Sequence, residues 1–175
     1  MYLISAYLDE ETNNRIQQYI NQVAKKTGNY CMVDGKVPPH ITISSFKTND
    51  IGLAMSLFEQ SIGQLQQGTI QWTSVGMFLP YVIYLSPVLN TYLHRLCEDI
   101  TDALKQIDGV QLSPYYRPFN WMPHTTIGKQ LSREEMQIAF QVLQHQFGPF
   151  EGRITKLGLA KTNPYEDIMT YNLSE

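Results

Sequence analysis

Residues 39–43 read Pro-His-Ile-Thr-Ile and residues 123–127 read Pro-His-Thr-Thr-Ile, so a nearly identical pentapeptide recurs after 84 residues, from His40 to His124. A second match, Thr-Ser-Val-Gly at 73–76 and Thr-Lys-Leu-Gly at 155–158, has an offset of 82 residues. Nearly equal offsets at two places predict that the chain contains two related halves. Packed about a pseudo-twofold axis, such halves would bring the matched motifs together at one shared groove.

Hydrophobic periodicity predicts a similar succession of strands and helices in each half. In the first half we expect strands at 2–8, 40–46 and 69–79, and helices carrying the stripes Ile16-Ile20-Val23 and Leu53-Leu57-Leu65. In the second half we expect strands at 81–85, 124–128, 153–161 and 168–173, and helical stripes from Leu89 to Ile107 and from Met136 to Phe147. The prediction is an α+β fold with one domain over 1–175, in which the lobes are roughly 1–80 and 81–175, with exchange of strands between them left open.

Length, composition and charge restrict the class of protein. A chain of 175 residues with 43% hydrophobic and 17% charged residues suits one compact domain. A net charge of -3 argues against binding a long stretch of nucleic acid, because that binding depends on clustered Lys and Arg. The chain has no apolar run near the roughly 20 residues that span a bilayer. We therefore expect a cytoplasmic monomer with no membrane partner and with Cys31 and Cys97 reduced.

The two repeated motifs carry the residues expected to do chemistry. Alternate residues of a strand face the same side, so His40 lies with Thr42, and His124 lies with Thr126. In-line cleavage of a phosphodiester needs a base for the nucleophile and an acid for the leaving oxygen. Histidine serves in either role, because its unperturbed pKa is about 6.5. One motif alone is typical of a structural histidine, but two copies at equivalent positions favour an acid/base pair, with the roles left open.

The threonines and the residues near the second motif are expected to bind substrate. Threonine hydroxyls can donate hydrogen bonds to the non-bridging oxygens of a phosphate. Tyr116, Arg117 and Trp121 combine aromatic rings with a cation, as in loops that stack a base and contact phosphate. Packing of these rings in the core is the alternative interpretation. Lys129 is expected to add positive charge near the phosphate, and Lys47 is interpreted as a solvated strand end. Further candidates for the groove walls are Tyr30, Tyr81 and Tyr165.

The sequence predicts neither a metal site nor a cofactor. A metal bound by His40 and His124 would normally also recruit carboxylates or further histidines, and none stands beside their motifs. The remaining histidines, His94 and His145, lie in predicted helices and are assigned to helix surfaces or packing. We therefore expect activity in the presence of a chelator.

The stretches Pro-Pro-His-Ile-Thr-Ile at 38–43 and Met-Pro-His-Thr-Thr-Ile at 122–127 resemble the paired His-X-Thr signatures of the 2H phosphoesterase superfamily. The similarity is to its branch of bacterial 2′-5′ RNA ligase-like and cyclic phosphodiesterase proteins, and it covers nearly the whole chain. It implies a bilobal fold with antiparallel sheets and flanking helices around a central groove. It also implies action on 2′,3′-cyclic phosphates, 2′-5′ linkages or related nucleotide cyclic phosphates, with His40, Thr42, His124 and Thr126 as site residues.

Two classes of function follow from this pattern. The first is a metal-independent phosphodiesterase of nucleotides or RNA ends, and a variant of it degrades cyclic nucleotide signals. The second is a non-catalytic module that binds a nucleotide or an RNA end. Binding alone does not require two titrating side chains with matching hydroxyls, so the intact motifs favour the enzyme.

Overall fold

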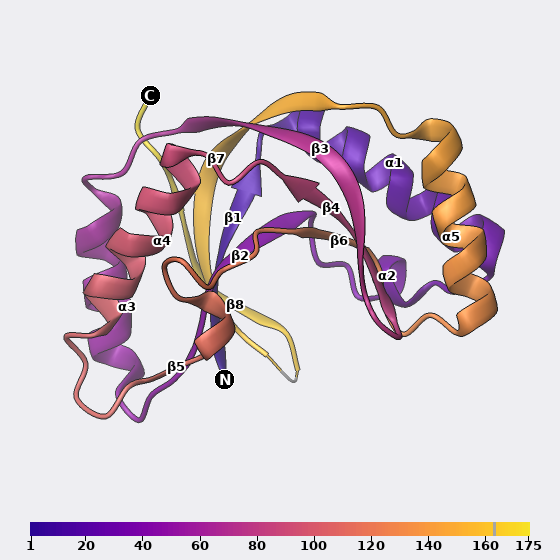
Figure 1. The fold of residues 1–175 in the computed structure, drawn as a ribbon. Helices are drawn as coiled ribbons and strands as arrows, with labels where there is room; N and C mark the ends of the chain where they lie inside the picture. The colour runs from indigo at the N-terminus through magenta and orange to yellow at the C-terminus, as the bar shows by residue number, and fades with distance from the viewer. Residues whose placement is uncertain (163) are drawn as a thin grey trace.

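The structure is a computed structural model that describes residues 1–162 and 164–175, in which an antiparallel sheet is flanked by helices (Figure 1). The strands are β1 (Tyr2–Leu8), β2 (His40–Lys47), β3 (Gly68–Phe78), β4 (Val82–Pro87), β5 (Gln111–Leu112), β6 (Thr125–Gly128), β7 (Phe150–Lys161) and β8 (Glu166–Asn172). The helices are α1 (Glu10–Thr27), α2 (Cys31–Asp34), α3 (Ile51–Ile62), α4 (Thr91–Leu104) and α5 (Arg133–Gln146), with a 3₁₀ turn at Pro114–Tyr116. The predicted α+β class with an antiparallel sheet is confirmed.

The order of the strands in the sheet reflects the internal repeat of the sequence. The sheet runs β5-β2-β1-β7-β3-β4-β6, and β8 pairs with β7. Strands β1, β2 and β3 of the first half correspond to β4, β6 and β7 of the second, so the run from β2 to β6 reads the same from either end. The pseudo-twofold axis therefore passes between β7 and β3. One half of the sheet therefore consists of β2 and β1 from the first repeat with β7 from the second. The other half consists of β4 and β6 from the second repeat with β3 from the first.

The helices form two pairs at opposite ends of the molecule (Figure 1). Helix α1 packs against α5, and α3 packs against α4. The apolar stripe of α1 is buried as predicted, with Ile16, Ile20 and Val23 each at most 2% exposed. The Asp9 carboxylate caps this helix by accepting from the Thr12 backbone N–H at 2.9 Å. These pairs cover the sheet, because α1 contacts β6 and α4 contacts β2.

A tryptophan joins the central strands to the second motif. Trp72 on β3 is fully buried, and its ring stacks on Phe150 of β7 with a centroid separation of 5.0 Å. Its indole N–H donates to the Thr125 hydroxyl of β6 at 3.2 Å. Thr125 thus points into the core, as the alternation of the strand requires. Truncating a buried aromatic side chain of this size typically costs about 3–5 kcal/mol.

The predicted element bounds differ from the observed ones mainly at helix ends. Leu89 and Ile107 lie outside α4, although Ile107 is 2% exposed and still packs in the core. The Asn90 side chain begins the helix by accepting from the Leu93 backbone N–H at 2.9 Å. The short elements α2 and β5 were not predicted, because they carry too few residues to show a period. Among the described residues, no helix is long and apolar enough to cross a membrane.

Candidate active site

The two motif strands come together although they lie at opposite ends of the sheet path. Strand β2 begins at His40, and β6 begins one residue after His124. The sheet curls so far that β2 and β6 contact each other, and Figure 1 shows them side by side. Residues 84 positions apart in the sequence therefore meet at one place.

Alternation along these strands separates core residues from site residues. On β2, Ile41 and Ile43 are fully buried in the core, whereas His40 is half-buried. Across the sheet, His40 pairs with Tyr7 of β1, and Thr42 pairs with Ser5. Thr42 is 8% exposed. Alternation along β2 thus puts His40 and Thr42 on one face of the sheet. In the second motif the half-buried His124 and Thr126 flank the fully buried Thr125, which follows the same alternation.

Each motif histidine is held by the same hydrogen bond. The Nδ1 atom of His40 lies 2.8 Å from the Pro38 carbonyl oxygen, and the Nδ1 atom of His124 lies 2.9 Å from the Met122 carbonyl oxygen. A carbonyl oxygen can only accept, so Nδ1 carries the proton in both rings. This tautomer leaves Nε2 as the nitrogen that can take up or release a proton. The two rings are therefore oriented identically with respect to their own strands.

The environment of the pair favours neutral imidazoles. Burial lowers the pKa of His40, and the positive charges of His124 and Lys129 lower it further, against the Pro38 hydrogen bond and the Asp167 carboxylate, which raise it. Burial also lowers the pKa of His124, against its hydrogen bond to Met122. The charge of His124 thus acts on His40, in agreement with the contact between β2 and β6.

The repeated glycines lie beneath tyrosine rings next to these histidines. A Cβ atom added at Gly158 would collide with the ring of Tyr7, and one added at Gly76 would collide with the ring of Tyr84. Only glycine lets these rings lie flat on the neighbouring strand. The Tyr7 ring centroid is 6.2 Å from that of His40, and the Tyr84 ring centroid is 5.4 Å from that of His124. The glycine that ends both repeated stretches, 73–76 and 155–158, is therefore explained by the tyrosine ring packed against it beside each motif histidine.

An aromatic cavity opens beside His124. It has a volume of about 410 Å³. Its lining residues are Phe78, Tyr115, Tyr116, Asn120, Met122 and His124. The rings of Phe78 and His124 are nearly perpendicular, with a centroid separation of 4.8 Å. Tyr115 and Tyr116 belong to the loop that the sequence predicts to stack a base, whereas Phe78 was not predicted. Phe78 comes from a strand 46 residues before His124, so only strand register could have placed it.

A cavity of about 480 Å³, lined mostly by polar residues and called here the polar cavity, adjoins Tyr7 and Pro38, the neighbours of His40. Its lining residues are Tyr7, Leu8, Asp9, Glu10, Asn13, Pro38, Thr155, Lys156, Asp167 and Thr170. The Tyr7 and Tyr165 hydroxyls are 2.8 Å apart, and the Tyr165 hydroxyl donates to the Asp167 carboxylate at 2.6 Å. Lys156 stands in the repeated stretch at 155–158 and was not assigned from sequence. Lys156 pairs with Tyr7 across β1 and β7, and this pairing puts it at the cavity.

Two of the predicted binding residues, Trp121 and Arg117, do not line the cavity beside His124. Trp121 is 6% exposed in the core, and its indole N–H donates to the Thr42 carbonyl oxygen at 3.1 Å, so it supports the first motif instead of stacking a base. Arg117 donates to the Leu112 carbonyl oxygen at 3.1 Å and lines a separate cavity with Lys105. Lys129 is exposed, and its charge reaches His40.

The remaining histidines and cysteines have local roles. His94 lies 3.4 Å from Glu98 on α4, and His145 is exposed near the end of α5. Cys31 and Cys97 are free. In the part of the chain that the structure describes, no three His, Cys, Asp or Glu side chains gather to hold a metal ion.

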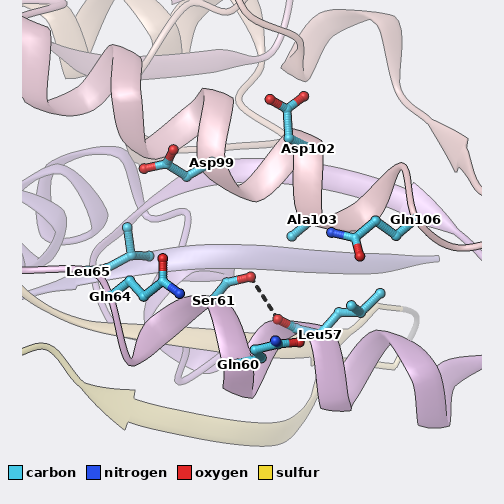
Figure 2. Close-up of a pocket in the computed structure, with 9 residues that line it drawn as sticks. All are labelled: Leu57, Gln60, Ser61, Gln64, Leu65, Asp99, Asp102, Ala103 and Gln106. Carbon is cyan, nitrogen blue, oxygen red and sulfur yellow. Dashed lines mark hydrogen bonds between the residues drawn. The ribbon is translucent and has the colours of Figure 1, made fainter.

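A further cavity of about 370 Å³ lies between α3 and α4 (Figure 2). Its lining residues are Leu57, Gln60, Ser61, Gln64, Leu65, Asp99, Asp102, Ala103 and Gln106. None of them belongs to the motif strands. The Ser61 hydroxyl donates to the Leu57 carbonyl oxygen at 2.7 Å, and Asp102 pairs with Lys105 at 2.8 Å. This cavity therefore lies apart from both His-X-Thr motifs.

Comparisons with known proteins agree with the geometry. The profile of the 2′-5′ RNA ligase superfamily matches residues 8–166. A crystal structure of a phosphoesterase has a TM-score of 0.66 at 15% identity, with coverage of 99% of this chain and 98% of the other. E. coli LigT in complex with 3′-AMP has a TM-score of 0.65 at 15% identity, with coverage of 99% and 98%.

TT0787 of Thermus thermophilus has a TM-score of 0.62 at 14% identity, with coverage of 98% of this chain and 97% of the other. No curated protein sequence matches the chain. At these identities the solved structures establish the fold, while the profile covers most of the chain and includes both motifs. The chain belongs to the 2′-5′ RNA ligase superfamily, the group of 2H phosphoesterases that its paired motifs predict.

Proposed function

We propose that the protein is a metal-independent phosphodiesterase that cleaves 2′,3′-cyclic phosphates or 2′-5′ phosphodiesters of nucleotides or RNA ends. Membership of the superfamily supports an enzyme of the phosphodiesterase kind. The observation that carries the proposal is the matched pair of Nδ1 hydrogen bonds, 2.8 Å at His40 and 2.9 Å at His124. Two rings held in the same tautomer on strands in contact suit a base and an acid on opposite sides of one phosphorus atom.

The proposed mechanism uses only side chains of this chain. One histidine accepts a proton at Nε2 from the attacking oxygen, and the other donates a proton from Nε2 to the leaving oxygen. Thr42 and Thr126 donate hydrogen bonds to the non-bridging oxygens, where negative charge is carried through the reaction. The proton gained by one ring equals the proton lost by the other, so the step leaves the two rings with exchanged protonation states. Release of a proton to solvent by the first ring and uptake of one by the second restore the starting states.

The aromatic cavity supports a nucleotide as the substrate. Stacking of a base on an aromatic side chain contributes about 1–3 kcal/mol per base. Phe78, Tyr115 and Tyr116 offer such rings next to His124. E. coli LigT has been solved with 3′-AMP, with NADP⁺ and with ATP, which agrees with a nucleotide ligand for this fold. The net charge of -3 favours a short substrate over a long RNA.

A substrate panel with EDTA present tests this proposal. We expect cleavage of 2′,3′-cyclic nucleotides or 2′-5′ dinucleotides at rates that EDTA does not change, measured by chromatography of the products. Loss of activity in EDTA, restored by a divalent metal, would contradict the metal-independent mechanism. Cleavage restricted to 3′-5′ cyclic oligonucleotides would instead support a role in degrading cyclic nucleotide signals. Tight binding of nucleotides without turnover would support the non-catalytic module.

The pH dependence follows from the lowered pKa values. Burial lowers the pKa of both His40 and His124 below the usual value of about 6.5. Activity needs one neutral and one protonated ring, so kcat/KM falls on the acid side as the base gains a proton and on the alkaline side as the acid loses one. The optimum of kcat/KM is therefore expected below pH 6.5. A bound phosphodiester anion raises both pKa values, so kcat should peak at higher pH than kcat/KM.

Steady-state kinetics across pH 4–9 in buffers of constant ionic strength, about 0.1 M, would measure both profiles. An optimum of kcat/KM above pH 7 would show that at least one ring does not titrate as its burial requires.

A further inference from the structure

The two cavities beside the histidine pair differ in chemistry. The aromatic cavity beside His124 is lined mainly by rings. The polar cavity on the side of His40 has three carboxylates, from Asp9, Glu10 and Asp167, and one lysine, Lys156, so its formal charge is negative. The internal repeat makes the motifs alike, but it does not make their surroundings alike.

The polar cavity adjoins His40 through two of its lining residues, Pro38 and Tyr7. Pro38 lines this cavity and also accepts the Nδ1 hydrogen bond of His40. Tyr7, another lining residue, is the partner of His40 across β1 and β2. The Asp167 carboxylate raises the pKa of His40, so its charge is felt at the reacting ring. A substrate group that extends past His40 would therefore enter this cavity.

Hydrogen bonds within the protein hold two of the carboxylates of this cavity in place. The Asp167 carboxylate accepts from the Tyr165 hydroxyl at 2.6 Å, and the Tyr7 hydroxyl joins the same cluster. The Asp9 carboxylate accepts from the Arg153 backbone N–H at 2.7 Å and from the Thr12 hydroxyl at 2.7 Å, which fixes it at the start of α1. Glu10 follows Asp9 and is exposed. Carboxylates in such positions suit hydroxyl or amino donors and repel anions.

From these features, and resting on the proposed function, we infer that the polar cavity receives an unphosphorylated nucleoside end of the substrate. The base on the other side of the scissile phosphorus stacks in the aromatic cavity, and ribose hydroxyls on the His40 side donate to the carboxylates. A second phosphate on the His40 side meets Glu10 and Asp167 and is disfavoured. The substrate class is accordingly a dinucleotide or a terminal linkage, and not an internal linkage of a longer RNA.

Three matched substrates test the inference with the full-length protein. They are a 2′-5′ dinucleotide without terminal phosphate, the same dinucleotide with a 5′-terminal phosphate, and the same dinucleotide with a 3′-terminal phosphate. We expect one of the phosphorylated forms to have a kcat/KM at least about tenfold below that of the unphosphorylated form. We expect the double variant Glu10→Gln/Asp167→Asn to reduce this ratio severalfold, because it removes two negative charges from the cavity.

The matched control is Glu11→Gln/Glu166→Gln. It removes the same charge from α1 and β8 at exposed neighbouring residues that do not line the polar cavity, so the ratio should stay at its wild-type value. Because both substrates are compared on one variant, an effect of Asp167 on the pKa of His40 cancels in the ratio.

The outcomes separate this inference from the proposed function. Equal efficiency on all three substrates, or a ratio that Glu10→Gln/Asp167→Asn leaves unchanged, would overturn the inference while the phosphodiesterase stands. Equal changes in the ratio for the test and control variants would also overturn it, since net charge alone would then explain the selectivity. Absence of turnover on every substrate, including 2′,3′-cyclic nucleotides, would overturn the proposed function and the inference with it.

Discussion

Replacement of either motif histidine, by His40→Ala or His124→Ala, is expected to lower kcat by about 10²- to 10⁴-fold, the usual contribution of general acid/base catalysis. In the proposed mechanism, each ring holds or moves the proton on its side of the phosphorus atom. Because the two act as a unit, the double variant should lose little more activity than either single variant. Single-turnover kinetics on a 2′,3′-cyclic nucleotide would measure these losses.

His145→Ala is the matched control for this experiment. His145 is exposed near the end of α5, so its loss should leave both kcat and the unfolding transition unchanged. Circular dichroism and thermal unfolding would verify that the His40 and His124 variants keep the fold. Turnover near the wild-type value in either motif variant would refute the acid/base pair.

The second large effect is expected from Thr42→Val and Thr126→Val, each of which should lower kcat by about 10²-fold. Valine keeps the shape of threonine and suits a strand, so the change removes only the hydroxyl donor. If the hydroxyls stabilise the transition state more than the bound substrate, the loss falls on kcat and not on KM. Initial rates over a range of substrate concentrations would separate the two parameters.

Thr125→Val gives an internal contrast within the same motif. The Thr125 hydroxyl accepts from the Trp72 indole in the core, so this variant should lower the free energy of unfolding by about 1–3 kcal/mol and leave kcat unchanged. A rise in KM alone for Thr42→Val and Thr126→Val would show that their hydroxyls only hold the ground state. A larger loss of kcat in Thr125→Val than in Thr126→Val would contradict the predicted alternation of the motif.

Much of the fold could be predicted because periodicity is visible among neighbouring residues and the repeat is visible when two stretches of the sequence are compared. The offset from His40 to His124 located equivalent strands, and the alternation of Ile41 with Thr42 showed which side chains face the core. The glycines at 76 and 158 marked a second equivalent place. Each of these signals needs only neighbouring residues and one comparison along the chain.

The parts that could not be predicted depend on strand register and on the direction of single side chains. Phe78 and Tyr7 reach the histidines from strands far away in the sequence, so no local pattern marks them. Aromatic residues before a motif suit a base or a core equally well, and Trp121 lies in the core while Tyr116 lines the cavity. The difference is one of geometry, since Trp121 has the Thr42 carbonyl oxygen within reach of its indole N–H.

Strands β3 and β7 each complete the half of the sheet that the other repeat begins, and this exchange limits where the chain can be divided. A polypeptide cut between Phe78 and Val82 would yield two fragments that each lack the strand needed to finish their own sheet, so neither would be stable without its complement. By the same reasoning, one copy of the repeat could make this architecture only as a homodimer. Each subunit would contribute one strand to the other subunit's half of the sheet and one histidine to the shared site. Fusion of two such copies into one gene would then allow the residues around each motif to change independently. The aromatic cavity and the polar cavity of this protein differ in that way.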